Sequence, residues 1–180
     1  MKILSTQRDS LASIIAQIRS KRSTPEDVTQ AVRGILQAVK TGGDRALVEL
    51  TQRFDKVQLT TKNLQVTRDE IEEAYLICEP KVIDALKRAQ KNIEIFHTKI
   101  FRRKDDVVEP ENGVKVWREF RPVEKVGLYV PGGKAAYPST VLMLGVPAKI
   151  AGCKEIIMCV PPMNDGKINP AVLVAADLGR

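Results

Sequence analysis

The sequence predicts an α/β protein in which an incomplete parallel sheet is preceded by helical segments. Two short apolar runs, 126–130 and 155–160, lack clear polar alternation, which is typical of strands buried on both faces. A helical segment at 139–151 lies between these runs, and a second one at 169–178 follows them. Because strand, helix and strand in this order form the unit of a parallel sheet, we expect the two strands to pair in parallel.

The beginning of the chain is predicted to be helical. Residues 1–22 are expected to form a helical arm, because apolar residues recur there at the spacing of one helix face. These residues are Leu11, Ile14, Ile15 and Ile18. Docking on another subunit is one way in which the arm can bury that face. A second helix is expected to begin at Pro25 with Thr24 as its cap, and Asp44 is expected to cap a third.

Two more helices and a turn are predicted before the first apolar run. Thr67 and Glu70 have the spacing of a capping box, and Pro80 separates their helix from a longer one. The apolar stripe of the longer helix consists of Val82, Ile83, Leu86, Ile93, Phe96 and Ile100. Asn112-Gly113, ahead of alternating Val114, Val116 and Phe120, predicts a turn into a strand or a hairpin.

The helix between the two apolar runs carries its own boundary signals. Ser139 or Thr140 is expected to cap it, and Gly152 is expected to end it. Gly145 and Pro147 inside the segment predict a kink.

The 180 residues are expected to be the front part of a longer polypeptide. A two-strand parallel sheet leaves both edges open, whereas open sheets usually have about 4 to 6 strands. Arg180 directly follows a helix that should lead into a third strand. A small domain that a second copy of itself completes is the alternative. We expect an arm at 1–22, part of a first domain at 23–121, and the first half of an α/β domain at 122–180.

Composition argues against several classes of function. The formal charge of +7 suggests an acidic partner, but aromatic residues are only 4% and the basic residues are spread along helices, so nucleic-acid binding is not expected. No apolar stretch approaches the roughly 20 residues of a membrane-spanning helix. The three cysteines, Cys78, Cys153 and Cys159, have no metal-ligand spacing. They are typical of a reducing compartment, and we expect a cytoplasmic protein.

The run 126–134, Val-Gly-Leu-Tyr-Val-Pro-Gly-Gly-Lys, is the most specific feature of the sequence. Adjacent glycines before a helix let backbone amides approach a ligand, so this loop is a candidate binding site for a cofactor phosphate. A tight turn between strand and helix is the alternative. The spacing fits neither a P-loop nor the dinucleotide Gly-x-Gly-x-x-Gly fingerprint, which argues against an ordinary kinase or Rossmann protein.

This run and its surroundings closely resemble histidinol dehydrogenase. The resemblance is carried by residues 121–143 and by Pro-Ala-Lys-Ile-Ala-Gly-Cys at 147–153. Upstream, Gly-Gly-Asp-Arg-Ala-Leu at 42–47, Phe54-Asp55 and the Ile93, Phe96, His97 pattern are similar too. The similarity runs over nearly the whole chain but covers only about the first two fifths of a family member.

The resemblance implies an aldehyde-dehydrogenase-like, Rossmann-like fold in which 122–180 opens a nucleotide-binding domain. It implies a homodimeric zinc enzyme of histidine biosynthesis that oxidises L-histidinol to L-histidine, through histidinal, with two NAD. It also implies that Tyr129 lies at the NAD site, since an aromatic ring with a hydroxyl can pack on a nicotinamide or ribose. A tyrosine in the core of the strand is the alternative for Tyr129.

No residue of the chain is expected to be catalytic or to bind the metal. The family's zinc histidines and Glu-His pair come from later sequence, and the only histidine here, His97, is expected to pack on its helix. The acidic residues 69–73 are expected to complement a helix dipole, and Ser139 is expected to be a cap. The chain alone is therefore predicted to be inactive. The alternatives are an NAD-dependent dehydrogenase of another small alcohol and a non-catalytic dimerisation or binding fragment.

Overall fold

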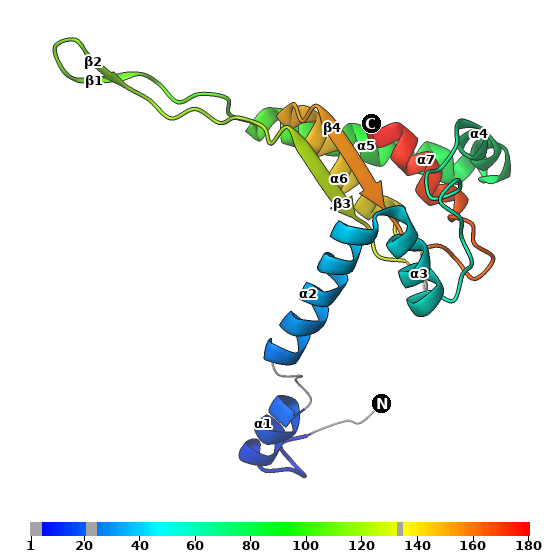
Figure 1. Ribbon diagram of the computed structural model, residues 1–180. Helices are drawn as coiled ribbons and strands as arrows, with labels where there is room; N and C mark the ends of the chain where they lie inside the picture. Colours follow the sequence, from blue (N-terminus) through cyan, green and yellow to red (C-terminus); the bar gives the residue numbers. More distant parts are fainter. Residues whose placement is uncertain (1–4, 21–24, 133–134) are drawn as a thin grey trace. The chain divides into compact units, whose positions relative to one another are not determined.

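A computed structural model describes residues 5–20, 25–132 and 135–180 (Figure 1). The chain divides into two compact units, Met1–Leu47 and Val48–Arg180. Among the described residues, no helix is both long and apolar enough to cross a membrane.

The first unit is helical, as the apolar periodicity predicts. It contains α1 (Leu11–Ser20) and α2 (Pro25–Gly42), and several of its large apolar side chains are exposed, for example Leu11 and Leu36. The predicted cap Thr24 lies outside the described residues.

Helix α3 (Asp44–Phe54) crosses the boundary between the units. The prediction that Asp44 caps it is wrong, because Asp44 is its first residue. Gly43 adopts a left-handed φ of 57° between α2 and α3, and its carbonyl accepts from the Leu47 N–H at 3.3 Å. The Gly43 carbonyl therefore accepts the first hydrogen bond of the helix. Glycine adopts this left-handed backbone conformation without strain.

The second unit begins with two helices whose boundaries follow the sequence signals. Helix α4 (Arg68–Ile77) is capped by Thr67, and both hydrogen bonds of the predicted capping box to Glu70 are present. Helix α5 (Pro80–Ile100) follows with proline in its first turn. The predicted hairpin is confirmed, since β1 (Val108–Glu111) pairs antiparallel with β2 (Val114–Val116) around Asn112-Gly113. Phe120 lies beyond the strand, although the prediction included it.

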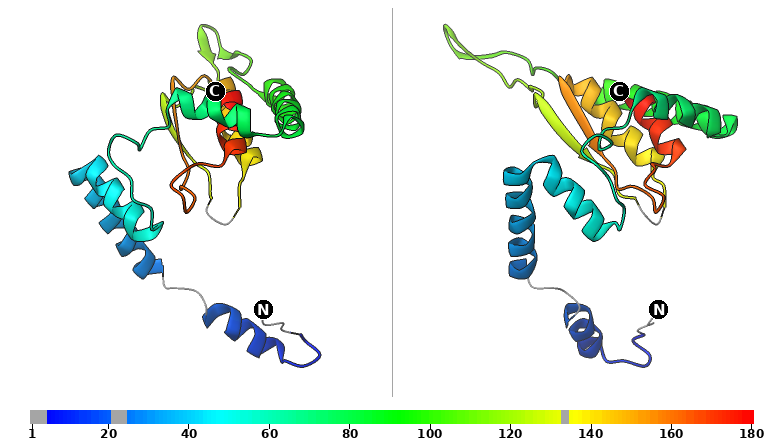
Figure 2. Two further views of the ribbon diagram at one scale, coloured as in Figure 1. Left: turned by 90° about the vertical axis from the view of Figure 1, so that its right-hand side faces the viewer. Right: turned by 45° about the vertical axis from the view of Figure 1, so that its right-hand side comes forward.

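The parallel unit is confirmed. Strands β3 (Lys125–Tyr129) and β4 (Glu155–Cys159) pair in parallel, with α6 (Pro138–Ala151) between them and α7 (Pro170–Gly179) after them. Helices α5, α6 and α7 pack against one another beside the sheet (Figures 1 and 2). The core lies among these elements, and its most buried large side chains are Leu142, Val130, Val141 and Val174.

Two predictions about α6 have different outcomes. Gly152 ends the helix in the left-handed conformation, with φ 89°, as predicted. The prediction of a Ser139 or Thr140 cap is wrong, because Tyr137 occupies the cap position without a side-chain bond. Pro138 takes the first helical position, where its ring already fixes a helical φ, so Ser139 and Thr140 fall inside the first turn.

One prediction of burial is also wrong within the second unit. The strands were expected to be covered on both faces, but both show alternating exposure. The apolar stripe of α5 is covered only in part, since Leu86 is buried whereas Phe96 and Ile100 are exposed. Helix α6 contacts both strands on one sheet face and packs with α7 against the part of α5 around Leu86, and no described element of this unit covers the remainder.

Candidate functional site

The parallel sheet of β3 and β4 has one covered face and one open face. Its parallel register pairs Val126 with Ile156 and Leu128 with Met158, and these four residues are half-buried. The alternate positions lie on the opposite face because successive strand residues point to opposite sides. That face carries Gly127, Tyr129, Ile157 and Cys159, all exposed. We call these four residues the open sheet face.

Tyr129 is the last residue of β3 and is 67% exposed within the unit. Its register partner is Cys159, and the next residue, Val130, donates its N–H to the Cys159 carbonyl at 3.0 Å. The pairing fixes the backbone of Tyr129, while its phenol makes no hydrogen bond to a described residue. Tyr129 is therefore not a core residue of this unit, and its ring and hydroxyl are both accessible to a ligand.

A shallow concavity lies where the two strands end. Its volume is about 200 Å³, and it is lined by Pro131, Gly132, Ala135, Ala136, Val160, Pro161, Met163, Asn169 and Val172. The carboxyl ends of parallel strands are the usual ligand position in open α/β sheets. The sequence reasoning missed Pro161, Met163 and Asn169. Their signal was available, since residues that follow β4 must meet the loop that follows β3 at the same sheet edge.

Gly132 shows why the loop after β3 needs a glycine. A Cβ at this position would lie 2.9 Å from Pro161 Cγ and 3.3 Å from its Cδ. Real Cβ atoms essentially never come closer than 3.0 Å to another heavy atom, so the two loops can approach this closely because residue 132 lacks a side chain. Residues 133 and 134 of the predicted phosphate loop lie outside the described residues.

The first turn of α6 offers little backbone to an anion. Pro138 has no N–H, and the N–H groups of Thr140 and Val141 donate to the Tyr137 carbonyl at 3.1 and 3.3 Å. In this turn, the Ser139 N–H is therefore the backbone donor that is left to bind a ligand. The helix terminus alone therefore gives weak support to the expected phosphate, since anion sites of this type use several free amides.

Comparison with known proteins gives consistent similarities. The family model described as histidinol dehydrogenase matches residues 18–179. The histidinol dehydrogenase of Clostridium acetobutylicum is 49% identical over 84% of this chain and 35% of its own length. That of Syntrophotalea carbinolica is 43% identical over 99% of this chain and 41% of its own. A crystal structure of histidinol dehydrogenase from Elizabethkingia anophelis superimposes with a TM-score of 0.80 and 42% identity, over 88% of this chain and 36% of that one.

The chain belongs to the histidinol dehydrogenase family. The resemblance stated from the run at 121–143 is thus confirmed, and the family is one of oxidoreductases. The chain spans only about a third to two fifths of the length of these histidinol dehydrogenases.

The described residues do not provide a zinc site for a histidinol dehydrogenase. Among them, no group of three or more His, Cys, Asp or Glu side chains is placed to hold a metal ion. His97 is half-buried on α5, with its ring edge-on to Phe96 at a centroid distance of 5.2 Å.

Three acidic residues at the start of α4 make structural contacts with other side chains or with the helix backbone. Glu70 forms the capping box, Glu72 pairs with Arg68 at 3.1 Å, and Glu73 lies 3.9 Å from Lys167. These contacts give the three glutamates structural roles and point to no role in proton transfer.

Proposed function

We propose that this chain is the NAD-contacting front part of a histidinol dehydrogenase that oxidises L-histidinol to L-histidine through histidinal. The observation that carries the proposal is the exposed Tyr129 at the carboxyl end of a parallel strand, in a chain 42–49% identical to family members. An exposed ring beside a concavity suits a planar cofactor group. Residues 122–180 would open an aldehyde-dehydrogenase-like, Rossmann-like domain, with residues 1–22 as an arm and 23–121 as part of a first domain.

Tyr129 suits a planar part of NAD, whereas the first turn of α6 offers few free amides to its phosphates. The Tyr129 ring can pack on a nicotinamide or ribose while its hydroxyl donates a hydrogen bond. The Gly132 backbone and Pro161 approach each other closely and line the mainly apolar concavity at the ends of the two strands. NAD, when bound, accepts the hydride that each of the two oxidation steps releases. In this proposal the chain's own residues orient that acceptor and exclude water from one side of it.

Zinc does not fit the described residues, so the proposal gives none of them a step on the metal. In the proposed enzyme, residues outside these 180 would hold zinc and supply the acid and base. A homodimer and a cytoplasmic location complete the proposal. Cys78, Cys153 and Cys159 form no disulfide with one another. This supports a cytoplasmic location, because reducing compartments keep thiols unpaired.

The proposal is tested by NADH formation from L-histidinol. A polypeptide that carries these residues at the length of the family's members is expected to reduce two NAD per histidinol and to lose activity when zinc is chelated. The 180-residue chain, a 20.0 kDa species, is expected to form no NADH with zinc present. Turnover by the pure short chain, or oxidation only of a different alcohol by the long polypeptide, would overturn the proposal.

A further inference from the structure

The concavity at the ends of β3 and β4 has one polar side chain among the described residues that line it. That side chain belongs to Asn169, and the other lining residues are Pro, Gly, Ala, Val or Met. Asn169 directly precedes α7 and is half-buried. Pockets that are mainly apolar fix the orientation of a ligand through a small number of placed polar groups. The chemistry of Asn169 therefore decides which group this concavity can hold.

The two ends of the Asn169 carboxamide have different roles. Its Oδ1 accepts the Ala171 N–H at 3.0 Å and so caps α7. Because a backbone N–H must face the oxygen of a carboxamide, this bond also fixes which way the group is turned. The Nδ2 atom makes no hydrogen bond to a described residue. The capping bond therefore holds an NH₂ group in place with its hydrogens free to donate.

Backbone donors around the concavity are scarce. Pro161 has no N–H, the Met163 N–H donates to the Lys167 carbonyl at 2.8 Å, and the Val172 N–H donates to the Asn169 carbonyl at 2.9 Å. The negatively charged diphosphate of NAD needs several free donors, and its burial against apolar side chains is costly. The concavity is therefore better suited to an uncharged acceptor than to the phosphates.

The loop that carries Asn169 is held in a fixed shape. The Gly166 N–H donates to the Met163 carbonyl at 2.9 Å, which closes a turn ahead of Asn169. Val57, which is buried, lies against this turn, since a Cβ on Gly166 would be 3.4 Å from Val57 Cγ1. A donor on an ordered loop loses little conformational freedom when a ligand binds, so Asn169 is prepared for that contact.

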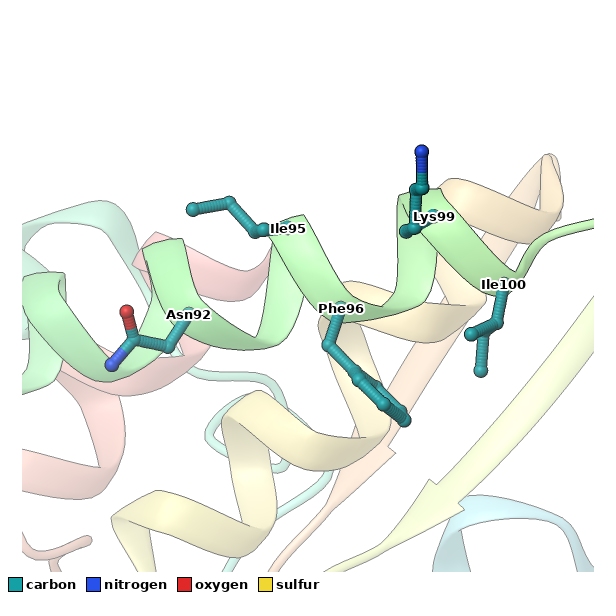
Figure 3. A pocket seen from close by; sticks show the side chains of 5 residues that line it. All are labelled: Asn92, Ile95, Phe96, Lys99 and Ile100. Atoms are coloured by element: carbon teal, nitrogen blue, oxygen red, sulfur yellow. The ribbon is translucent and has the colours of Figure 1, made fainter.

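A larger concavity, of about 420 Å³, lies on α5 and has no comparable arrangement (Figure 3). It is lined by Asn92, Ile95, Phe96, Lys99 and Ile100. All five residues come from one helix and are exposed, so this lining contacts an occupant from one side. The concavity at the strand ends is instead built from the residues after β3, the residues after β4 and α7. It is therefore the better site for a small planar group.

We propose that Asn169 Nδ2 donates a hydrogen bond to an uncharged acceptor of NAD, either a ring nitrogen of adenine or the carboxamide oxygen of nicotinamide. The planar group lies in the concavity while Asn169 Oδ1 keeps α7 capped. The concavity of about 200 Å³ holds one such group and not the whole dinucleotide, since ligand pockets usually measure about 300 to 1,000 Å³. This inference rests on the function proposed above and adds to Tyr129 a second residue that contacts the cofactor.

Two substitutions separate the donor from the cap. Asn169→Asp keeps an oxygen for the Ala171 N–H but has no N–H to donate, so in a polypeptide of the family's full length α7 stays capped. The dissociation constant for NAD, measured by calorimetric titration, should rise about tenfold or more. Asn169→Ser, a neutral cap, should raise it about fivefold or more. A rise with aspartate alone would show repulsion by the new charge and would overturn the proposal.

Asn63→Asp is the matched control. Asn63 Oδ1 also accepts a backbone N–H, that of Thr60 at 2.6 Å, but Asn63 is exposed and does not line the concavity. The variant should bind NAD like the parent. The unfolding midpoint of Asn169→Asp should equal that of the parent, because the cap is retained.

Titration with each half of the cofactor identifies the acceptor. Either AMP or nicotinamide mononucleotide should bind Asn169→Asp more weakly than the parent, and the other should bind both proteins equally. Weakening of both halves, or of neither, would contradict a single hydrogen bond from Asn169.

The failure of this inference is distinct from the failure of the proposed function. A full-length parent that does not bind NAD overturns both. If the parent binds NAD and Tyr129→Ala weakens binding while Asn169→Asp and Asn169→Ser bind like the parent, the proposed function stands and the role of Asn169 is wrong.

Discussion

The phenol of Tyr75 donates a 3.0 Å hydrogen bond to Asp177 Oδ2, which joins α4 to α7 across 102 residues of sequence. The other carboxylate oxygen, Oδ1, pairs with Arg68 at 3.2 Å and with Arg180 at 2.7 Å. Gln90 of α5 donates to the Leu178 carbonyl at 2.7 Å beside this cluster. The last turn of α7 is therefore held by side chains from two other helices, which fixes the helical layer under the sheet.

Removal of the Tyr75 hydroxyl should weaken this layer. Tyr75→Phe keeps the ring but loses the bond to Asp177, so the free energy of unfolding should fall by about 1 kcal/mol. The arginines still satisfy the carboxylate, which keeps the loss moderate. Urea unfolding followed by circular dichroism measures the change. An unchanged unfolding midpoint would show that the bond contributes nothing.

The same contact predicts a pH dependence. Partial burial raises the pKa of Tyr75 above its ordinary value of 10.0, and the hydrogen bond to Asp177 raises it further. The folded state thus favours the neutral phenol. This contribution to stability is fully present below the unfolded pKa and is lost as pH rises through the folded pKa. Unfolding curves at about pH 8 and about pH 11 should show the difference between parent and Tyr75→Phe shrinking at the higher pH.

Leu142 is the largest fully buried side chain of the core. Leu142→Ala leaves a cavity between α6 and its neighbours and should lower the free energy of unfolding by about 2 to 5 kcal/mol. Leu76→Ala is the control, since Leu76 is 87% exposed and its loss should change stability by about 0.5 kcal/mol or less. Chemical denaturation of the two variants compares them directly. Equal losses would mean that the assigned core is wrong.

Gly152 ends α6 with a φ of 89°, where a side chain is strained although its nearest neighbour would be Pro122 Cγ at 3.7 Å. Gly152→Ala should therefore cost about 1 to 2 kcal/mol through backbone strain rather than a clash. Gly34→Ala, in helix α2 with open space around it, should not destabilise. Thermal unfolding of both variants separates the two effects, and a neutral Gly152→Ala contradicts the left-handed helix end.

The sequence predicted the elements whose signals are local. Thr67 and Glu70 form their capping box because both partners lie within one turn, and Asn112-Gly113 turns the hairpin because few other residues tolerate that backbone. The α6 start was missed because Pro138 imposes a helical φ and moves Ser139 inside the first turn. The pattern of 155–160 correctly indicated a strand, but it also predicted burial on both faces, whereas exposure alternates along the strand.

The concavity at the strand ends was predicted only in part. Residues on the β3 side, up to Gly132, carried a recognisable pattern. Pro161 and Asn169 come from a different loop, and only the parallel register of β3 with β4 brings the two loops together. The predicted parallel pairing implied that the two loops meet, but no local pattern indicated which residues of the second loop line the concavity.

The affinity for NAD of Tyr129 variants tests the central claim most directly. In a polypeptide of the family's full length, calorimetric titration should give a dissociation constant about tenfold or more higher for Tyr129→Ala than for the parent, because the variant loses both ring and hydroxyl. Tyr129→Phe should lie between them, and Met143→Ala, at an exposed α6 position, should bind like the parent. If Tyr129→Ala binds NAD as tightly as the parent, the open sheet face does not hold the cofactor.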